Sequence, residues 1–260
     1  MRTAAVTANT ELGAYRLIAA DDVAGPAPQP GQFYMLSAAE RWGGIEDGRP
    51  YLPRAFSYAR ARSAGNGVTL EFLLEAIGPG TERLASMEPG DELALVGPLG
   101  IGFRLESDRR RVLVGGGIGS APLVCLQEEL PEAQVLLGFR SGEHASAAGL
   151  FDAPKVATDD GSSGRRALVT ELLGEELERE AEAEVLACGP PPMLEVVRAM
   201  CAERDLPAQL ALESGMACGF GACFGCVVPT RDGYARLCVD GPVLDAACLE
   251  SAIFPGAGHA

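Results

Sequence analysis

The chain has 260 residues, of which 47% are hydrophobic and 22% charged, and its formal net charge at pH 7 is -15. This size and apolar content are typical of two compact domains with a small additional unit. The negative charge repels phosphate backbones and anionic lipid surfaces, so neither nucleic-acid binding nor membrane binding is expected.

No apolar run approaches the roughly 18–20 residues that a membrane span needs, and the first fifteen residues lack the apolar segment of a signal peptide. We therefore expect a cytoplasmic protein. Eight cysteines in a reducing compartment are not expected to form a disulfide framework. They are expected to be free and buried, or to hold a metal.

Residues 1–105 carry the pattern of an antiparallel β-barrel, in which short apolar stretches alternate with Pro and Gly turns. Residues 36–53 form a long loop in this reading. The expected strands lie in residues 15–20, 32–37, 56–60, 68–77 and 91–97.

Strands and helices alternate in residues 106–208, which predicts a parallel sheet with right-handed crossovers. A glutamate-rich helix is expected from residue 169, with Thr170 as its N-cap and a solvated acidic face. Residues 209–260 form a third, cysteine-rich unit. The predicted fold class is therefore a multidomain α+β protein: a β-barrel, an α/β domain and a small C-terminal domain.

Four cysteines of the third unit have a distinctive spacing, Cys218-x4-Cys223-x2-Cys226-x11-Cys238. Zinc sites usually offer two C-x-x-C pairs, whereas the x4–x2 order is that of plant-type [2Fe–2S] loops. The intervening glycines and alanines let backbone N–H groups approach negatively charged sulfur. A zinc site and uncoordinated thiols remain alternatives. The other cysteines, which lack such spacing, are expected to be small buried apolar residues: Cys125, Cys188, Cys201 and Cys248.

Two features of the barrel region suit a flavin. In the stretch Arg54–Ser57, the arginine can bind a pyrophosphate and Ser57 can hydrogen-bond a ring edge. Further on, a glycine turn precedes Thr81, which we interpret as the N-cap of a helix whose start could face a phosphate. Chance strands and ordinary turns can also produce both features.

Two glycine turns of the α/β region follow predicted strands, at the edge where open parallel sheets bind ligands. The first, VLVGGGIGSAP, is not the G-x-G-x-x-G fingerprint, because Ser120 replaces the last glycine. Pro122 suits the first turn of the following helix. The residues predicted to bind nicotinamide dinucleotide are Gly115, Gly116, Gly117, Gly119, Cys188, Gly189 and Pro190.

The sequence gives opposing indications about whether the protein prefers NAD or NADP. Arg140 and Ser141 end a predicted strand and could bind the 2′-phosphate of NADP. Glu143 follows closely and would repel that phosphate, as would Asp159 and Asp160 if they lie near the site. NAD is the expected cofactor, because these acidic residues disfavour the phosphate and because the family that the whole chain resembles uses NAD.

Together these segments resemble the ferredoxin reductase superfamily, and ESGMACGFGACFGCVVP with YARLCVDGPVL resembles the electron-transfer subunits of class B dihydroorotate dehydrogenases. The resemblance spans nearly the whole chain. It implies that Cys218, Cys223, Cys226 and Cys238 ligate a [2Fe–2S] cluster. It also implies that FAD contacts three stretches: Arg54, Ala55, Phe56 and Ser57; Leu73, Leu74 and Glu75; and Gly80 and Thr81.

The resemblance implies a role in pyrimidine biosynthesis. Electrons would pass from the FMN of a separate catalytic subunit through the cluster and FAD to NAD+, in a heterotetramer with two copies of each subunit. A flavin joins one-electron and two-electron chemistry. No catalytic residue is assigned for dihydroorotate oxidation, since His144 and His259 are both expected in loops or the tail. Alternatives are the flavin subunit of a sulfide dehydrogenase or of a ferredoxin:NADP oxidoreductase, and a zinc-stabilised binding module.

Phe220 and Phe224 lie between the cluster cysteines. Both would be exposed if the loop wraps only the cluster, and an exposed aromatic pair would suit a protein interface. The alternative is that both pack back onto the rest of the chain. The sequence does not decide between these two arrangements.

Overall fold

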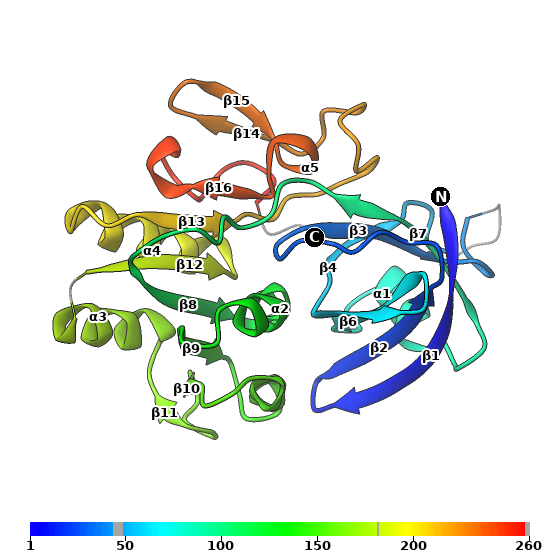
Figure 1. Cartoon of the computed structure of the whole chain (residues 1–260), viewed down its shortest axis with the longest axis horizontal. Coiled ribbons are helices and arrows are strands. Elements are labelled where there is room, and N and C mark those ends of the chain that lie inside the picture. Colours follow the sequence, from blue (N-terminus) through cyan, green and yellow to red (C-terminus); the bar gives the residue numbers. More distant parts are fainter. Residues whose placement is uncertain (44–48, 181, 258–260) are drawn as a thin grey trace.

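The structure, a computed structural model, describes residues 1–43, 49–180 and 182–257. Within these residues, two seven-stranded sheets lie side by side, and the C-terminal segment, orange to red in Figure 1, lies above both. Residues 44–48 of the predicted long loop, and His259, lie outside the described residues. No helix in the described ranges is long and apolar enough to cross a membrane.

The N-terminal sheet is antiparallel throughout and curls into a half-barrel, which confirms the predicted antiparallel unit. Its edge strands β4 and β5 do not pair in the described chain. Side chains such as Tyr34 and Phe72 fill the interior, with ring centroids 5.6 Å apart. In spatial order the strands are β4 (Arg54–Ser57), β3 (Phe33–Ala38), β7 (Glu92–Leu99), β1 (Arg2–Leu12), β2 (Tyr15–Asp22), β6 (Gly67–Leu74) and β5 (Arg60–Ala64).

The half-barrel differs from the sequence prediction at two places. The predicted strand at 56–60 is divided between β4 and β5. The helix α1 (Pro79–Ala85) begins after Gly78, not at Thr81. The Thr81 hydroxyl instead accepts the backbone N–H groups of Ile77 and Gly78, at 2.9 and 3.1 Å, so Thr81 closes the turn from the third helical position.

The second sheet is parallel except at one edge, which confirms the predicted α/β unit. All six residues of β12 are buried, as expected for a central strand covered on both faces. The order is β11 (Arg165–Arg166), β10 (Lys155–Thr158), β9 (Gln134–Phe139), β8 (Arg110–Gly116), β12 (Ala183–Cys188), β13 (Ala208–Ala211) and β16 (Val243–Asp245), the last antiparallel.

Helices complete the α/β unit. In Figure 1, α2 lies between the parallel sheet and the half-barrel, while α3 and α4 lie on the outer side. Pro122 is in the first turn of α2, as predicted. The helical segments are η1 (Gly117–Ser120), α2 (Ala121–Glu129), η2 (His144–Leu150), α3 (Val169–Arg179) and α4 (Pro191–Glu203).

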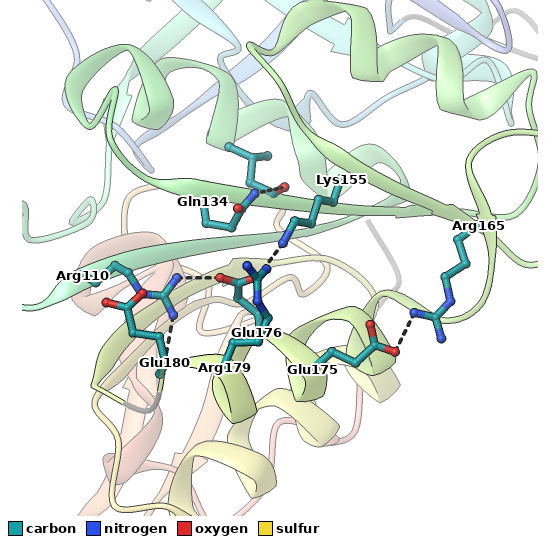
Figure 2. A network of polar contacts seen from close by, with 9 residues as sticks. Arg110, Gln134, Lys155, Arg165, Glu175, Glu176, Arg179 and Glu180 are labelled. Carbon is teal, nitrogen blue, oxygen red and sulfur yellow. Dashed lines mark hydrogen bonds and ion pairs between the residues drawn. The ribbon is translucent and has the colours of Figure 1, made fainter.

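The acidic helix α3 corrects two predictions. Its N-cap is Leu168, not Thr170, because the Glu171 carboxylate accepts the Leu168 N–H at 2.8 Å. Its acidic face is also not wholly solvated. Glu176 is only 6% exposed and pairs with Arg110 at 2.9 Å and Lys155 at 2.6 Å (Figure 2). These pairs fasten α3 to the starts of β8 and β10.

The C-terminal segment adds an antiparallel hairpin and returns to the parallel sheet. Its elements are β14 (Val227–Thr230), β15 (Gly233–Arg236), α5 (Leu237–Asp240), β16 and η3 (Ala246–Cys248). Glu195 of α4 fixes the chain after η3, accepting the Ser251 hydroxyl at 3.0 Å and the Ala252 N–H at 2.6 Å. The domain limits at residues 105 and 208 stay a prediction.

Candidate functional site

A cavity of about 470 Å³ lies where the half-barrel, the α/β unit and the cysteine loop meet. The half-barrel contributes the four residues of β4 together with Leu73, Glu75 and Thr81. The α/β unit contributes Ile118, Ala121 and Pro122, and the last wall is Glu213–Ala217 with Gly225. The structure thus brings together most of the residues that were predicted to bind flavin.

Two predicted flavin residues do not line this cavity. Leu74 is 1% exposed and belongs to the core of the half-barrel. Gly80 is buried beside Arg54, and a Cβ at Gly80 would lie 2.8 Å from the arginine Nε. Gly80 therefore makes room for the guanidinium, which is a supporting role rather than a cavity contact.

Arg54 has the features of an anion ligand. Its guanidinium stacks over the Trp42 ring at 5.8 Å and donates to the Leu52 carbonyl at 2.5 Å. Among the described residues, no carboxylate pairs with it. A guanidinium that is oriented by neighbours but not neutralised suits a pyrophosphate.

A second cavity, of about 580 Å³, opens at the carboxyl ends of the parallel strands. Five predicted dinucleotide residues line it: Gly116, Gly117, Gly119, Gly189 and Pro190. Gly115 and Cys188 do not, because both are buried within β8 and β12.

The glycines of the two turns are required by close packing of the backbone. A Cβ on Gly119 would lie 2.5 Å from the Gly189 Cα, and a Cβ on Gly116 would lie 2.6 Å from the Met193 Sδ. The two turns therefore touch one another and form a continuous floor for the second cavity, which a side chain at either position would disturb.

A polar network crosses from the half-barrel to the α/β unit at the rim of the second cavity. Arg140 donates to Glu75 at 2.5 Å and to the His144 Nε2 at 2.8 Å, and Ser141 contacts the His144 Nδ1 at 2.8 Å. Tyr15 packs edge-on against the His144 ring. His144 was expected in a loop or the tail. It is in fact buried, at 8% exposure, in the short helix η2.

Glu213 was not singled out from the sequence, yet it lines both cavities, together with Glu75, Ile77 and Ile118. Burial raises the pKa of Glu213. Within the described chain no cation pairs with it. A carboxyl with a raised pKa at the junction of two ligand cavities is a candidate for proton transfer. Its sequence signals are its place two residues after a strand end and at the start of the ESGMACG stretch, just before the cysteine loop.

The four predicted cluster cysteines form two pairs. Cys218 lies beside Cys223, and the Cys238 backbone N–H donates to the Cys226 Sγ at 3.5 Å. Among the described residues, no three His, Cys, Asp or Glu side chains gather around a single point. Two thiol pairs suit a [2Fe–2S] cluster, in which each iron takes two cysteines, better than a single tetrahedral zinc.

The loop also supplies the donors that sulfur needs. The Gly221 N–H lies 3.1 Å from the Cys238 Sγ, and the Gly225 N–H 3.4 Å from the Cys223 Sγ. Partial burial raises the pKa of Cys218, but backbone donors, that of Cys223 foremost, outweigh it and lower the pKa to about 6. Burial raises the pKa of Cys238 to about 12. Thiols and donors together fit the predicted cluster.

The cysteine loop is exposed on one side. Phe220 and Phe224 are 64% and 62% exposed, which decides the open question of their packing, and Arg236 stacks over the Phe224 ring at 5.4 Å. Cys223 is exposed, while Cys226 and Cys238 are buried. Of the four remaining cysteines, Cys248 is half-buried and the other three are buried as expected.

Comparisons with known proteins agree with this geometry. The family model described as the iron-sulfur cluster binding domain of dihydroorotate dehydrogenase B matches residues 213–250. A protein of Caldanaerobacter subterraneus subsp. tengcongensis is 35% identical, with 84% of this chain and 86% of the relative covered, and one of Geobacillus kaustophilus is 40% identical, with 84% and 85% covered. Both are named dihydroorotate dehydrogenase B (NAD(+)), electron transfer subunit.

A solved structure shows the same fold over nearly the whole chain. It is an NADH-dependent reduced ferredoxin-NADP oxidoreductase that is 23% identical, with a TM-score of 0.80 and with 96% of this chain and 91% of that chain covered. The ferredoxin reductase of carbazole 1,9a-dioxygenase, at 23% identity and a TM-score of 0.65, covers 78% of this chain and 65% of that chain. By its sequence relatives, the chain belongs to the family of electron transfer subunits of dihydroorotate dehydrogenase B.

Proposed function

We propose that this protein carries electrons from the FMN of a dihydroorotate dehydrogenase catalytic subunit through a [2Fe–2S] cluster and FAD to NAD+. The observation that carries this proposal is the order of the three sites. The flavin cavity shares Ile118 and Glu213 with the dinucleotide cavity on one side. On its other side it is lined by Ala217 and Gly225, the sequence neighbours of Cys218 and Cys226.

A bound flavin supplies the exchange between single electrons and a hydride. The chain's own residues bind and orient the groups around it. Arg54 would hold the flavin pyrophosphate, and the backbone and side chains of Ala55, Phe56 and Ser57 would flank the ring system. The touching turns of Gly119 and Gly189 would place the dinucleotide over the shared wall of the two cavities.

Proton balance gives Glu213 its role. Two electrons that arrive singly and leave as a hydride require one proton from a protein group or from water. Glu213 is the carboxyl at the shared wall whose pKa is raised by burial, which strengthens its hold on a proton. Glu75, the other carboxyl there, is paired with Arg140. We therefore assign proton delivery to the Glu213 carboxyl.

The partner surface follows from exposure. Cys223, Phe220 and Phe224 form an exposed patch at the cysteine loop, so a bound cluster would lie close to the protein surface. Exposed aromatic side chains of this kind are enriched at protein interfaces. We assign docking of the catalytic subunit to this patch. The assembly with two copies of each subunit is part of this proposal.

Composition is the first test. The purified protein should contain one FAD, two non-haem irons and acid-labile sulfide per chain, without zinc. Reconstitution with a dihydroorotate dehydrogenase catalytic subunit should then give dihydroorotate-dependent NAD+ reduction. Stoichiometric zinc without labile sulfide would contradict the cluster, and a loaded protein that forms no active complex would contradict the assigned partner.

A further inference from the structure

We infer that Glu75 sets the dinucleotide selectivity of this protein, by occupying the arginine that would otherwise bind a 2′-phosphate. The inference rests on the proposed NAD-linked function and names the residue that excludes NADP. Glu75 comes from the half-barrel, directly after β6, and Arg140 from the α/β unit, directly after β9. The selectivity device is thus divided between two units of the fold.

Arg140 stands where a 2′-phosphate would be read. It follows the strand next to β8, whose own turn forms the cavity floor, and it lines the dinucleotide cavity. In folds of this type the end of that strand lies near the adenosine ribose, and an arginine there accommodates NADP. On its own, Arg140 would therefore favour the phosphorylated dinucleotide.

Three groups hold Arg140 away from that role. The Glu75 Oε1 accepts from the arginine Nη2 at 2.5 Å. Because arginine only donates, the His144 Nε2 at 2.8 Å is the acceptor for the arginine Nε. The opposite ring nitrogen of His144 is engaged by the Ser141 hydroxyl at 2.8 Å, which fixes the ring. The guanidinium is therefore both neutralised and oriented toward Glu75.

A 2′-phosphate at this position would be repelled by nearby carboxylates. It would have to displace the Glu75 carboxylate, whose side chain is 23% exposed, and leave it close to a dianion. Asp159 also lines the cavity and adds a second negative charge. Glu143 and Asp160, the other acids expected to act here, do not line it. An unphosphorylated ribose meets none of these penalties.

The experiment compares Glu75→Gln with wild-type protein containing its FAD. Isothermal titration calorimetry measures the dissociation constants of adenosine 5′-monophosphate and adenosine 2′,5′-bisphosphate. Turnover of NADH and NADPH with ferricyanide gives a second ratio. Both ratios should shift by about 10- to 100-fold toward the phosphorylated ligand, the range of one charge-assisted hydrogen bond. Glu143→Gln removes a nearby charge of the same sign without touching Arg140, and it should shift them by less than about threefold.

Variants of Arg140 test whether this residue binds the 2′-phosphate. In the double variant Glu75→Gln/Arg140→Gln the gain should disappear. Arg140→Gln alone should leave the wild-type ratio nearly unchanged, because Glu75 already occupies the arginine. If Glu75→Gln loses its FAD, the ratio measured for Arg140→Gln alone still tests the inference.

Several results would overturn the inference. These are an unchanged ratio in Glu75→Gln, a gain that survives in the double variant, an equal gain in Glu143→Gln, or a strong loss of bisphosphate binding in Arg140→Gln alone. Wild-type protein that binds neither nucleotide would instead refute the proposed function, and the selectivity inference with it.

Discussion

The two ends of the parallel sheet place two carboxylates, Glu176 and Glu213, in different surroundings. At the amino ends of β8 and β10, Glu176 is surrounded by Arg110, Lys155 and, at 3.5 Å, Arg179. At the carboxyl ends, the half-buried Glu213 lines two cavities, and no cation of the described residues pairs with it. The first arrangement compensates a buried charge and stabilises the fold, whereas the second leaves a carboxyl free to exchange a proton.

Among the carboxylate variants, the largest effect should come from Glu213→Gln, which removes the proposed proton donor with little change in side-chain volume. Dihydroorotate-dependent NAD+ reduction should fall by about 100-fold, at the lower end of general acid catalysis. The wild-type rate should decline as pH rises through the raised pKa of Glu213, and this limb of the pH profile should be absent in the variant.

The free energy of unfolding should not fall in the same variant, although its turnover does. Because the folded-state pKa is raised, the ionised carboxylate destabilises the native state at pH values above the ordinary pKa of glutamate. Urea unfolding at pH 8 should therefore show Glu213→Gln to be no less stable than wild type. A clear loss of stability with full turnover would assign Glu213 to structure.

Glu176→Ala should show the opposite profile. It leaves Arg110 and Lys155 without their carboxylate partner at a buried site. We expect the free energy of unfolding to fall by about 2 to 3 kcal/mol. This is less than for fully buried pairs, because both cations are partly exposed. Turnover of the folded protein should be unchanged. Glu175→Ala is the matched control, since its pair with Arg165 is exposed (Figure 2) and should contribute less than about 1 kcal/mol.

The next comparison concerns exposed apolar side chains of the cysteine loop and of the half-barrel. Phe220→Ala or Phe224→Ala should weaken binding of the catalytic subunit by about tenfold, the effect of one moderate interface residue. The visible spectrum of the cluster and NADH oxidation with an artificial acceptor should persist. Val23→Ala, exposed on the half-barrel, is the control. Wild-type affinity in both phenylalanine variants would place the interface elsewhere.

The smallest effect should come from Glu195, which is paired but only half-buried. Bidentate hydrogen bonds from Arg198, opposed by burial and assisted by Ala252 and Ser251, lower its pKa to about 2. The stabilisation is therefore present above the ordinary glutamate pKa and is lost as pH falls toward 2. Wild type should be about 1 kcal/mol more stable than Glu195→Gln at pH 7. A difference that does not shrink at pH 3 would argue against this ion pair.

Sequence patterns predicted the features that depend on local spacing. The cysteine spacing indicated the loop, and alternating strands and glycine turns indicated the parallel sheet. The strand β1 was not among the predicted strands, because RTAAVTANTEL contains few bulky apolar residues and pairs through its backbone with β2 and β7. Its register depends on partners that lie far apart in the sequence.

Side-chain roles that depend on tertiary contacts were beyond sequence reasoning. Glu176 stands in a run of glutamates, and only the starts of β8 and β10 distinguish it from its neighbours. His144 had no motif, and its burial follows from packing on Tyr15 of the half-barrel. Glu213 gains its character from the meeting of two cavities, each built from both halves of the molecule.

The most direct test of the electron route is the Cys223→Ser variant assembled with the catalytic subunit. It removes Cys223, the exposed member of the Cys218–Cys223 pair and a proposed cluster ligand, and Cys223 lines neither the flavin nor the dinucleotide cavity. We predict protein that retains FAD and NADH oxidation with ferricyanide, but whose dihydroorotate-dependent NAD+ reduction falls at least 100-fold. Reduction of NAD+ at the wild-type rate in protein shown to lack the cluster would contradict the account.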